Sequence, residues 1–181
     1  NRLFRLMTSM RSADLRRSTL FVAGADADIH VQALRAHPDM LIQDLEDGTP
    51  AQLRQAARYC SAALFADAKR HGIVAAVRIN TLESIGRDDL AAVMASLPQV
   101  VFLPKCTSGA QVAALAQELD RLEVQHRLPP GAIEIVPNAE TAAGVMNLKE
   151  IALASARVKS ALLGTEDLAA DLMAERSVDA E

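Results

Sequence analysis

The sequence lacks the features that would identify a secreted, membrane or zinc-binding protein. It has two cysteines, Cys60 and Cys106, and neither belongs to a CxxC pair or a cysteine–histidine cluster, so neither a disulfide framework nor a zinc site is indicated. No apolar run approaches the roughly 20 residues that span a bilayer. The opening residues also lack the continuous apolar core of a signal peptide. These absences predict a cytoplasmic protein without a membrane partner.

Support for nucleic-acid or nucleotide binding is also missing. The formal net charge is −4, and Lys and Arg are spread along the chain, so there is no electrostatic footprint for a phosphate backbone. Neither GxGxxG nor GxxxxGK[ST] occurs, which removes the usual signature of dinucleotide and P-loop folds. We therefore expect no nucleic-acid partner.

What the sequence does contain is a repeated alternation of short apolar runs and amphipathic stretches. Half of the 181 residues are hydrophobic, which suffices for one sizeable core. The alternation is typical of βα units around a parallel sheet, and the runs are nearly all apolar, as strands buried on both faces should be. The expected strands are 19–23, 40–44, 74–79, 100–104, 133–136 and 160–163.

Helix signals fill the intervals between these strands. Apolar residues recur at three- and four-residue spacing over 54–70 and 111–125, as in helices that pack one face against a sheet. The string Thr49-Pro50-Ala51-Gln52 predicts a helix start with a threonine cap, a proline at the first position and a capping box. Ser108 and Gln111 predict a second capping box.

Six βα units in series allow an open doubly wound sheet or a (β/α)₈ barrel without its last two units. An open sheet would gather its polar residues at one switch point, whereas here nearly every expected strand ends in a charged or amide side chain. Only a barrel brings all these ends to one mouth. We therefore expect an α/β TIM barrel covering about six βα units: residues 1–16 form a flexible leader, residues 17–181 form the catalytic domain, and the C-terminal units are absent.

The polar residues at these strand ends are the candidate site. They are Asp44, Glu46 and Asp47 after the second strand, Arg78 and Asn80 after the third, Lys105 after the fourth, Glu140 after the fifth and Asp167 after the sixth. Three carboxylates as close in sequence as the first three repel one another unless a cation sits among them. This favours a site, although a solvated acidic loop that caps the next helix explains the same string about as often.

Glu140 and Asp167 are candidate metal ligands. Adjacent strands lie about 5 Å apart, so two carboxylates at matching heights can share one hard cation. Mg²⁺ is the natural occupant, because it accepts one or two protein carboxylates and completes its shell with water and substrate oxygens. Helix capping explains each carboxylate equally well at this stage.

Two basic residues accompany the carboxylates. Arg78 could clamp a substrate carboxylate through two parallel hydrogen bonds, or it could pair with Asp44 or Glu46 and hold the barrel end together. Lys105 could be a Schiff-base lysine. Beside a carboxylate cluster, an ion-pair role is the favoured interpretation of Lys105.

Taken in order, these motifs resemble one family. The matching strings are Arg17-Ser18-Thr19-Leu20-Phe21-Val22, Asp44-Leu45-Glu46-Asp47, Arg78-Ile79-Asn80, Leu103-Pro104-Lys105, Ala139-Glu140-Thr141-Ala142-Ala143-Gly144-Val145 and Gly164-Thr165-Glu166-Asp167-Leu168-Ala169-Ala170-Asp171. They look like successive signatures of the citrate lyase β-subunit-like branch of the HpcH/HpaI aldolase family. Each string is weak by itself, but six in the right order, with one at each strand end, are specific.

The resemblance implies a barrel of the phosphoenolpyruvate/pyruvate type, Mg²⁺ dependence and a homo-oligomer (trimer or hexamer). It implies a carbon–carbon lyase that cleaves or forms a 3-hydroxyacyl-CoA-type thioester (citramalyl-, malyl- or citryl-), with a small 2-oxo acid and acetyl-CoA as the other partners. The roles carried over are metal ligation for Glu140 and Asp167, substrate binding for Arg78 and Arg17, and a catalytic charged network for Asp44, Glu46, Asp47 and Lys105.

The chain departs from this family at two places. Ala23 stands where the family usually has a proline, which is expected to reshape the loop near the pantetheine arm. The last two βα units and the C-terminal segment are missing, and in relatives such as malyl-CoA lyase that segment supplies an acidic catalytic residue to a neighbouring subunit.

Two other functions stay open. One is a pyruvate-type class II aldolase that acts on free aldehydes, although Asp47 stands where such aldolases tend to carry a histidine. The other is a non-autonomous β subunit of a citrate lyase complex, which works only with partner chains and an acyl carrier protein.

Overall fold

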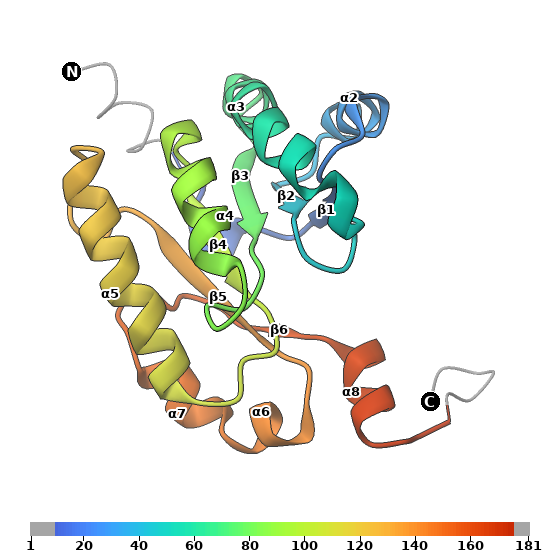
Figure 1. Ribbon diagram of the computed structural model, residues 1–181, viewed down its shortest axis with the longest axis vertical. Coiled ribbons are helices and arrows are strands. Elements are labelled where there is room, and N and C mark those ends of the chain that lie inside the picture. The colour runs from blue at the N-terminus through green and yellow to red at the C-terminus, as the bar shows by residue number, and fades with distance from the viewer. Residues whose placement is uncertain (1–9, 176–181) are drawn as a thin grey trace.

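The computed structural model describes residues 10–175, which form a curled, six-stranded parallel sheet (Figure 1). The strands are β1 (Thr19–Ala23), β2 (Met40–Asp44), β3 (Val74–Arg78), β4 (Val100–Leu103), β5 (Glu134–Ala139) and β6 (Leu162–Leu163). Each strand pairs with the next one in sequence, which is the order of a barrel and not of a doubly wound sheet. The prediction of a partial TIM-barrel-like fold is confirmed.

Helices cover the outer face of the sheet. Figure 1 shows α2 (Ala27–Ala36), α3 (Arg54–Arg70), α4 (Gly86–Val93) and α5 (Gly109–Gln125) following one another along it. The shorter helices are α6 (Ala142–Met146), α7 (Leu148–Leu153) and α8 (Thr165–Asp171), and the 3-10 turns are η1 (Ala13–Leu15), η2 (Ala51–Leu53) and η3 (Met94–Ser96). Among the described residues, no helix is long and apolar enough to cross a membrane.

The two faces of the sheet carry separate apolar cores, because successive side chains of a strand point to opposite faces. On the outer face, strand residues such as Leu41 and Val77 pack with helix residues such as Phe65. The inner face holds a smaller cluster of buried residues: Met40, Ile42, Val74, Ala76, Val100, Phe102 and Val136. Burial on both faces explains why the strands are nearly all apolar.

Strand bounds follow the predictions closely at the start of the chain and less closely at its end. β1 and β2 have the predicted bounds, and β3 and β4 each end one residue earlier than predicted. β5 differs most, since it begins at Glu134 and runs three residues beyond Val136. The reason is pairing: Pro137 lies opposite Leu103 of β4, and Asn138 lies opposite Leu162 of β6.

Both predicted helix caps are wrong in detail. Thr49 does not cap a helix: its hydroxyl donates to the carbonyl of Asp44 over 2.5 Å and accepts from the backbone N–H of Gly24 over 2.7 Å, so it ties two loops together. Ser108 makes no side-chain cap of α5. Gln111 accepts instead from the backbone N–H of Thr107 over 2.8 Å.

The segment before β1 belongs to the fold from residue 10 onward. Arg16 donates from Nη1 and Nη2 to both carboxylate oxygens of Glu134, over 2.7 and 3.0 Å, and its side chain is 4% exposed. Arg11 pairs with Asp39, and Met10 packs against the inner apolar cluster. Met10, Arg11 and Arg16 of the predicted flexible leader are therefore in contact with the rest of the fold, whereas residues 1–9 of that leader lie outside the described residues.

Candidate functional site

An open pocket of about 320 Å³ lies at the carboxyl ends of the strands. It is lined by Phe21, Asp44, Arg78, Glu140 and residues 162–167, which include Asp167. Four of the residues predicted from strand ends thus share one pocket, although they come from four different segments of the chain. Active sites of TIM barrels lie at this end of the strands.

Asp44 fixes the position of Arg78. Arg78 donates from Nε to Oδ1 of Asp44 over 2.8 Å and from Nη2 to Oδ2 over 2.5 Å, which is the bidentate geometry of a strong pair. The same carboxylate accepts the backbone N–H groups of Glu46 and Gly48 over 3.0 and 2.8 Å. A Cβ at residue 48 would lie 2.3 Å from Asp44 Oδ2, so this turn requires glycine. Since both of its oxygens are engaged, Asp44 is an anchor for the guanidinium.

The guanidinium of Arg78 retains one nitrogen that Asp44 does not bind. Nη1 lies 3.2 Å from Oε2 of Glu46, which is an ion-pair distance. This oxygen of Glu46 is buried and accepts no hydrogen bond from the described residues. The guanidinium carbon also lies 5.1 Å from the centroid of the Phe21 ring, within the range of a cation–π contact. Arg78 is therefore held on two sides and keeps Nη1 available for a further acceptor.

Lys105 links the acidic loop to β4. Its ammonium donates to Glu46 Oε1 over 2.7 Å and to Asp47 Oδ2 over 3.3 Å. The hydrogen bond to Glu46 raises the pKa of Lys105, so the amine stays protonated. A protonated lysine is a poor nucleophile, and the geometry therefore supports the ion-pair interpretation over a Schiff base.

Glu140 follows β5 directly and is 2% exposed. Its Oε1 accepts the backbone N–H of Lys105 over 2.6 Å. Lys105 has a positive φ of 49°, which is uncommon for a residue other than glycine. On the other side, a Cβ at residue 164 would lie 2.6 Å from Oε2 of Glu140, so Gly164 permits the close approach of the chain before α8.

The electrostatics of this carboxylate favour a cation in the pocket. Burial raises the pKa of Glu140; the N–H of Lys105 opposes this rise, while the negative charges of Glu46 and Asp167 add to it. A carboxylate whose ionised form is disfavoured by neighbouring negative charge is stabilised by a positive ion beside it. Glu140 and Asp167 line the same pocket, so the side chains present fit a bound cation.

The donor set indicates which kind of cation fits. Within residues 10–175, no group of three or more His, Cys, Asp or Glu side chains is arranged to hold a metal ion. Structural zinc and calcium sites generally need more protein ligands than this, whereas Mg²⁺ is commonly held by one or two carboxylates, water and substrate oxygens. Asp167 lies in the exposed first turn of α8, where water has access to it.

Glu46, Asp47 and Lys105 do not line this pocket but connect to its residues through the contacts described above, whereas Arg17 lies away from it. Arg17 precedes β1, and its backbone N–H and its Nε approach Oδ2 of Asp39 at 2.7 and 3.4 Å. Asp39 precedes β2, so this contact lies at the amino ends of the strands. The predicted substrate-binding role of Arg17 has no support from its position.

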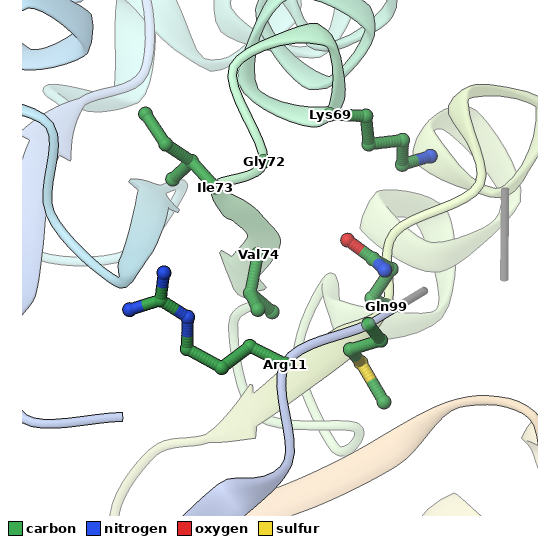
Figure 2. A pocket seen from close by; sticks show the side chains of 7 residues that line it. Arg11, Lys69, Gly72, Ile73, Val74 and Gln99 are labelled. Carbon is green, nitrogen blue, oxygen red and sulfur yellow. The ribbon is translucent and has the colours of Figure 1, made fainter. Parts of the chain in front are cut away.

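A second pocket lies at that amino end, and Figure 2 shows the side chains around it. It is lined by Met10, Arg11, Lys69, Gly72, Ile73, Val74 and Gln99 and measures about 20 Å³. That volume is close to the minimum for a single water molecule. This pocket is therefore too small for a carboxylic acid substrate.

Sequence reasoning missed Phe21 and Gly164 as parts of the site. Phe21 reads as an ordinary apolar strand residue, and only its contact with Arg78 shows its role. A signal for Gly164 was present, because a glycine at the end of a strand often marks a close backbone approach. It stands directly before Thr165, where α8 begins.

Comparison with known proteins agrees with this geometry. A family model described as HpcH/HpaI aldolase/citrate lyase matches residues 17–181. Citrate lyase subunit beta of Escherichia coli (strain K12) is 33% identical over 168 residues, which are 92% of this chain and 56% of that protein. The malyl-CoA/beta-methylmalyl-CoA/citramalyl-CoA lyase of Chloroflexus aurantiacus is 33% identical over 152 residues, 78% of this chain and 43% of that protein.

A solved structure also resembles the fold. The citrate lyase beta subunit of M. tuberculosis, complexed with oxaloacetate and magnesium, has a TM-score of 0.72 and 29% identity, and the match covers 92% of this chain and 68% of that one. The chain spans about half the length of the curated relatives described above.

Proposed function

Because the chain belongs to the HpcH/HpaI aldolase/citrate lyase family, we propose that it is a Mg²⁺-dependent carbon–carbon lyase. The substrate is a 3-hydroxyacyl-CoA-type thioester (citramalyl-, malyl- or citryl-), which is cleaved into a 2-oxo acid and acetyl-CoA or formed from them. The observation that carries the proposal is the shared pocket, where a fixed arginine faces two carboxylates from successive strand ends. The names of the similar lyase and of the similar structure support these partners.

Glu140 and Asp167 are the proposed Mg²⁺ ligands. When bound, Mg²⁺ supplies Lewis-acid stabilisation of the negative charge that develops on oxygen as the bond breaks. Lys105 contributes through its backbone, since its N–H fixes Oε1 of Glu140. The other oxygen, Oε2, lies beside Gly164 in the pocket lining and is the proposed metal-facing atom.

Arg78 is the proposed binding group for the carboxylate of the 2-oxo acid. Asp44 and Phe21 hold its guanidinium in place before substrate arrives, so little conformational entropy is lost on binding. Nη1 is the nitrogen left for the substrate, because Nε and Nη2 already donate to Asp44.

Glu46, Asp47 and Lys105 form the proposed charged network around the site. Lys105 balances the charge of Glu46, and Glu46 in turn contacts Arg78. This chain of ion pairs connects the loop after β2 with the strand ends of β3 and β4. Its proposed task is to keep Arg78 and Glu140 at a constant separation.

The proposed setting is a homo-oligomer, a trimer or hexamer, in the cytoplasm. Exposed large apolar side chains support an assembly, since Met146, Leu172 and Met173 are 83%, 55% and 92% exposed and a second subunit would cover them.

The test is a turnover assay of the full-length protein with citramalyl-, malyl- and citryl-CoA in the presence of Mg²⁺. We expect one of the thioesters to be cleaved, and Glu140→Ala to abolish the reaction. Glu118→Ala is the matched control, because Glu118 is a carboxylate of α5 that pairs with Arg121 and does not line the pocket. Absence of turnover with all three thioesters would contradict the proposal.

The same assay separates the two alternative functions. A class II aldolase would cleave substrates made from pyruvate and free aldehydes. A non-autonomous β subunit would become active only after partner subunits and a thioester on an acyl carrier protein are added.

A further inference from the structure

Asn138 is a polar residue on the inner face of β5 that the proposed mechanism does not use. It stands between Val136, a member of the inner apolar cluster, and Glu140, which lines the pocket. Side chains two residues apart on a strand share one face, so Asn138 lies directly below Glu140 along the inner face. Its partner in the register with β6 is the apolar Leu162.

The side chain of Asn138 is completely buried, with 0% exposure. Neither Oδ1 nor Nδ2 has a hydrogen-bond partner among the described residues. Buried amides are almost always hydrogen-bonded, and an exception requires an explanation. The backbone carbonyl of Asn138 accepts the N–H of Cys106 over 3.0 Å, a contact that leaves the side-chain amide unpartnered.

Along the chain of β5, the nearest ionisable side chain on the same face is that of Glu140, which directly follows the strand. Alternate residues of a strand are about 6.6 Å apart, a span that a small hydrogen-bonded molecule can bridge between a side-chain amide and a carboxylate. Water is the natural bridge, because buried water typically joins polar groups that have no protein partner.

We propose that Asn138 is a positioning residue for Glu140, which it contacts through one internal water molecule. The amide of Asn138 donates to the water, and the water donates to the carboxylate from below. Glu140 is then fixed on two sides, by the backbone of Lys105 and by this water. This inference rests on the proposed function, since it assigns Glu140 as a ligand of Mg²⁺.

The expected size of the effect follows from the behaviour of other metal sites. Groups that hydrogen-bond to a metal ligand orient it, and their removal typically weakens metal binding by about 10- to 100-fold. If Asn138 had only a structural role, its replacement would not change the Mg²⁺ affinity. Replacing an unsatisfied buried amide by an apolar group of similar size is nearly neutral or stabilising and would leave the metal affinity unchanged.

The experiment measures Mg²⁺ affinity by isothermal titration calorimetry, together with the melting temperature, for the full-length protein and its variants. Asn138→Leu should weaken Mg²⁺ binding by about 10- to 100-fold without lowering the melting temperature. Asn138→Ser, which keeps a group able to bind water, should recover most of the affinity. If Asn138→Leu does not fold, Asn138→Ala provides the same comparison with a smaller side chain.

Val136→Ala is the matched control, because Val136 lies on the same strand and face but is apolar. It should lower the melting temperature and leave Mg²⁺ affinity unchanged. Equal Mg²⁺ affinity in Asn138→Leu and the unmodified protein would overturn the positioning role of Asn138 and leave the proposed function standing. Lack of Mg²⁺ binding by the unmodified protein would overturn the proposed function itself, and this inference with it.

Discussion

The two ends of the sheet are built from the same kinds of residue but use them differently. At the amino end, both oxygens of Glu134 accept from Arg16, and Asp39 accepts the backbone N–H groups of Arg17 and Ser18. At the carboxyl end, Glu46 has a buried oxygen without a hydrogen bond, and the ionised form of Glu140 is destabilised by burial and by neighbouring negative charge.

This contrast separates charges that hold the fold together from charges that are available for chemistry. A carboxylate with all its acceptor sites filled has little left to offer a ligand. A buried carboxylate with incomplete compensation is costly, and such groups cluster at functional sites. The contrast predicts that substitutions at the amino end change stability, whereas those at the carboxyl end change binding.

The largest effect is expected for Glu140→Gln, which keeps the shape of the side chain and removes its charge. Mg²⁺ affinity should fall on the order of 1,000-fold, about 4 kcal/mol, because one of two proposed ligands is lost. The melting temperature in the presence and absence of Mg²⁺ measures this. Mg²⁺ should raise it in the unmodified protein and in the control Glu118→Gln, and not in Glu140→Gln. An equal rise in all three would show that Glu140 is not a ligand.

Arg16→Met should have the next largest effect, and on stability only. Removing one partner of a buried pair leaves an uncompensated charge on Glu134, which costs about 3 kcal/mol or more. Chemical denaturation measures the free energy of unfolding, and Mg²⁺ titration of the folded variant should match the unmodified protein. A clear loss of Mg²⁺ affinity would mean that the two ends are coupled.

Arg78→Lys should weaken binding of the 2-oxo acid by about 30-fold, or about 2 kcal/mol, the size of a hydrogen bond to a charged group. A lysine keeps the positive charge but cannot reproduce the bidentate contact with Asp44 while presenting a further donor. Steady-state kinetics in the synthetic direction, with KM for the oxo acid as the readout, tests this. An unchanged KM would assign the carboxylate-binding role to another residue.

For Lys69, at the amino end, we expect a smaller effect on stability that depends on pH. Burial lowers the pKa of Lys69 to about 8, and its amine donates to the carbonyls of Ser96 and Leu97. Between about pH 8 and the ordinary lysine pKa near 10.4, the unfolded chain binds the proton more tightly, so this group adds stability as pH rises.

The measurement compares the free energy of unfolding of Lys69→Met and the unmodified protein from pH 7 to pH 10. The free energy of unfolding of the unmodified protein should rise relative to that of the variant as the pH increases through this window. If the difference in free energy of unfolding stays constant with pH, burial does not shift the pKa of Lys69.

Arg17→Ala should have the smallest effect. Its side chain is 84% exposed in its pair with Asp39, and exposed ion pairs contribute about 1 kcal/mol or less. Turnover and Mg²⁺ affinity should be unchanged, because Arg17 lies at the amino end. A large rise in KM on this substitution would restore the substrate-binding role predicted from the sequence.

The sequence by itself determined where along the chain the six strands lie and which polar residues stand at or after their ends. Alternation and apolarity are local properties, so the bounds of β1 and β2 and the strand-end positions of Arg78 and Glu140 could be read directly. The barrel-like order also followed, because polar residues at nearly every strand end favour a barrel over an open sheet.

Only the tertiary structure decided how these residues are partnered. The sequence allowed Arg78 either to pair with Asp44 or to bind substrate, and the structure shows the pair with Asp44 and leaves Nη1 in an ionic contact with Glu46. It also placed Arg17 at the far end and turned the backbone of Lys105 toward Glu140. Such contacts join residues distant in sequence, and they depend on strand register and loop conformation, which no local pattern encodes.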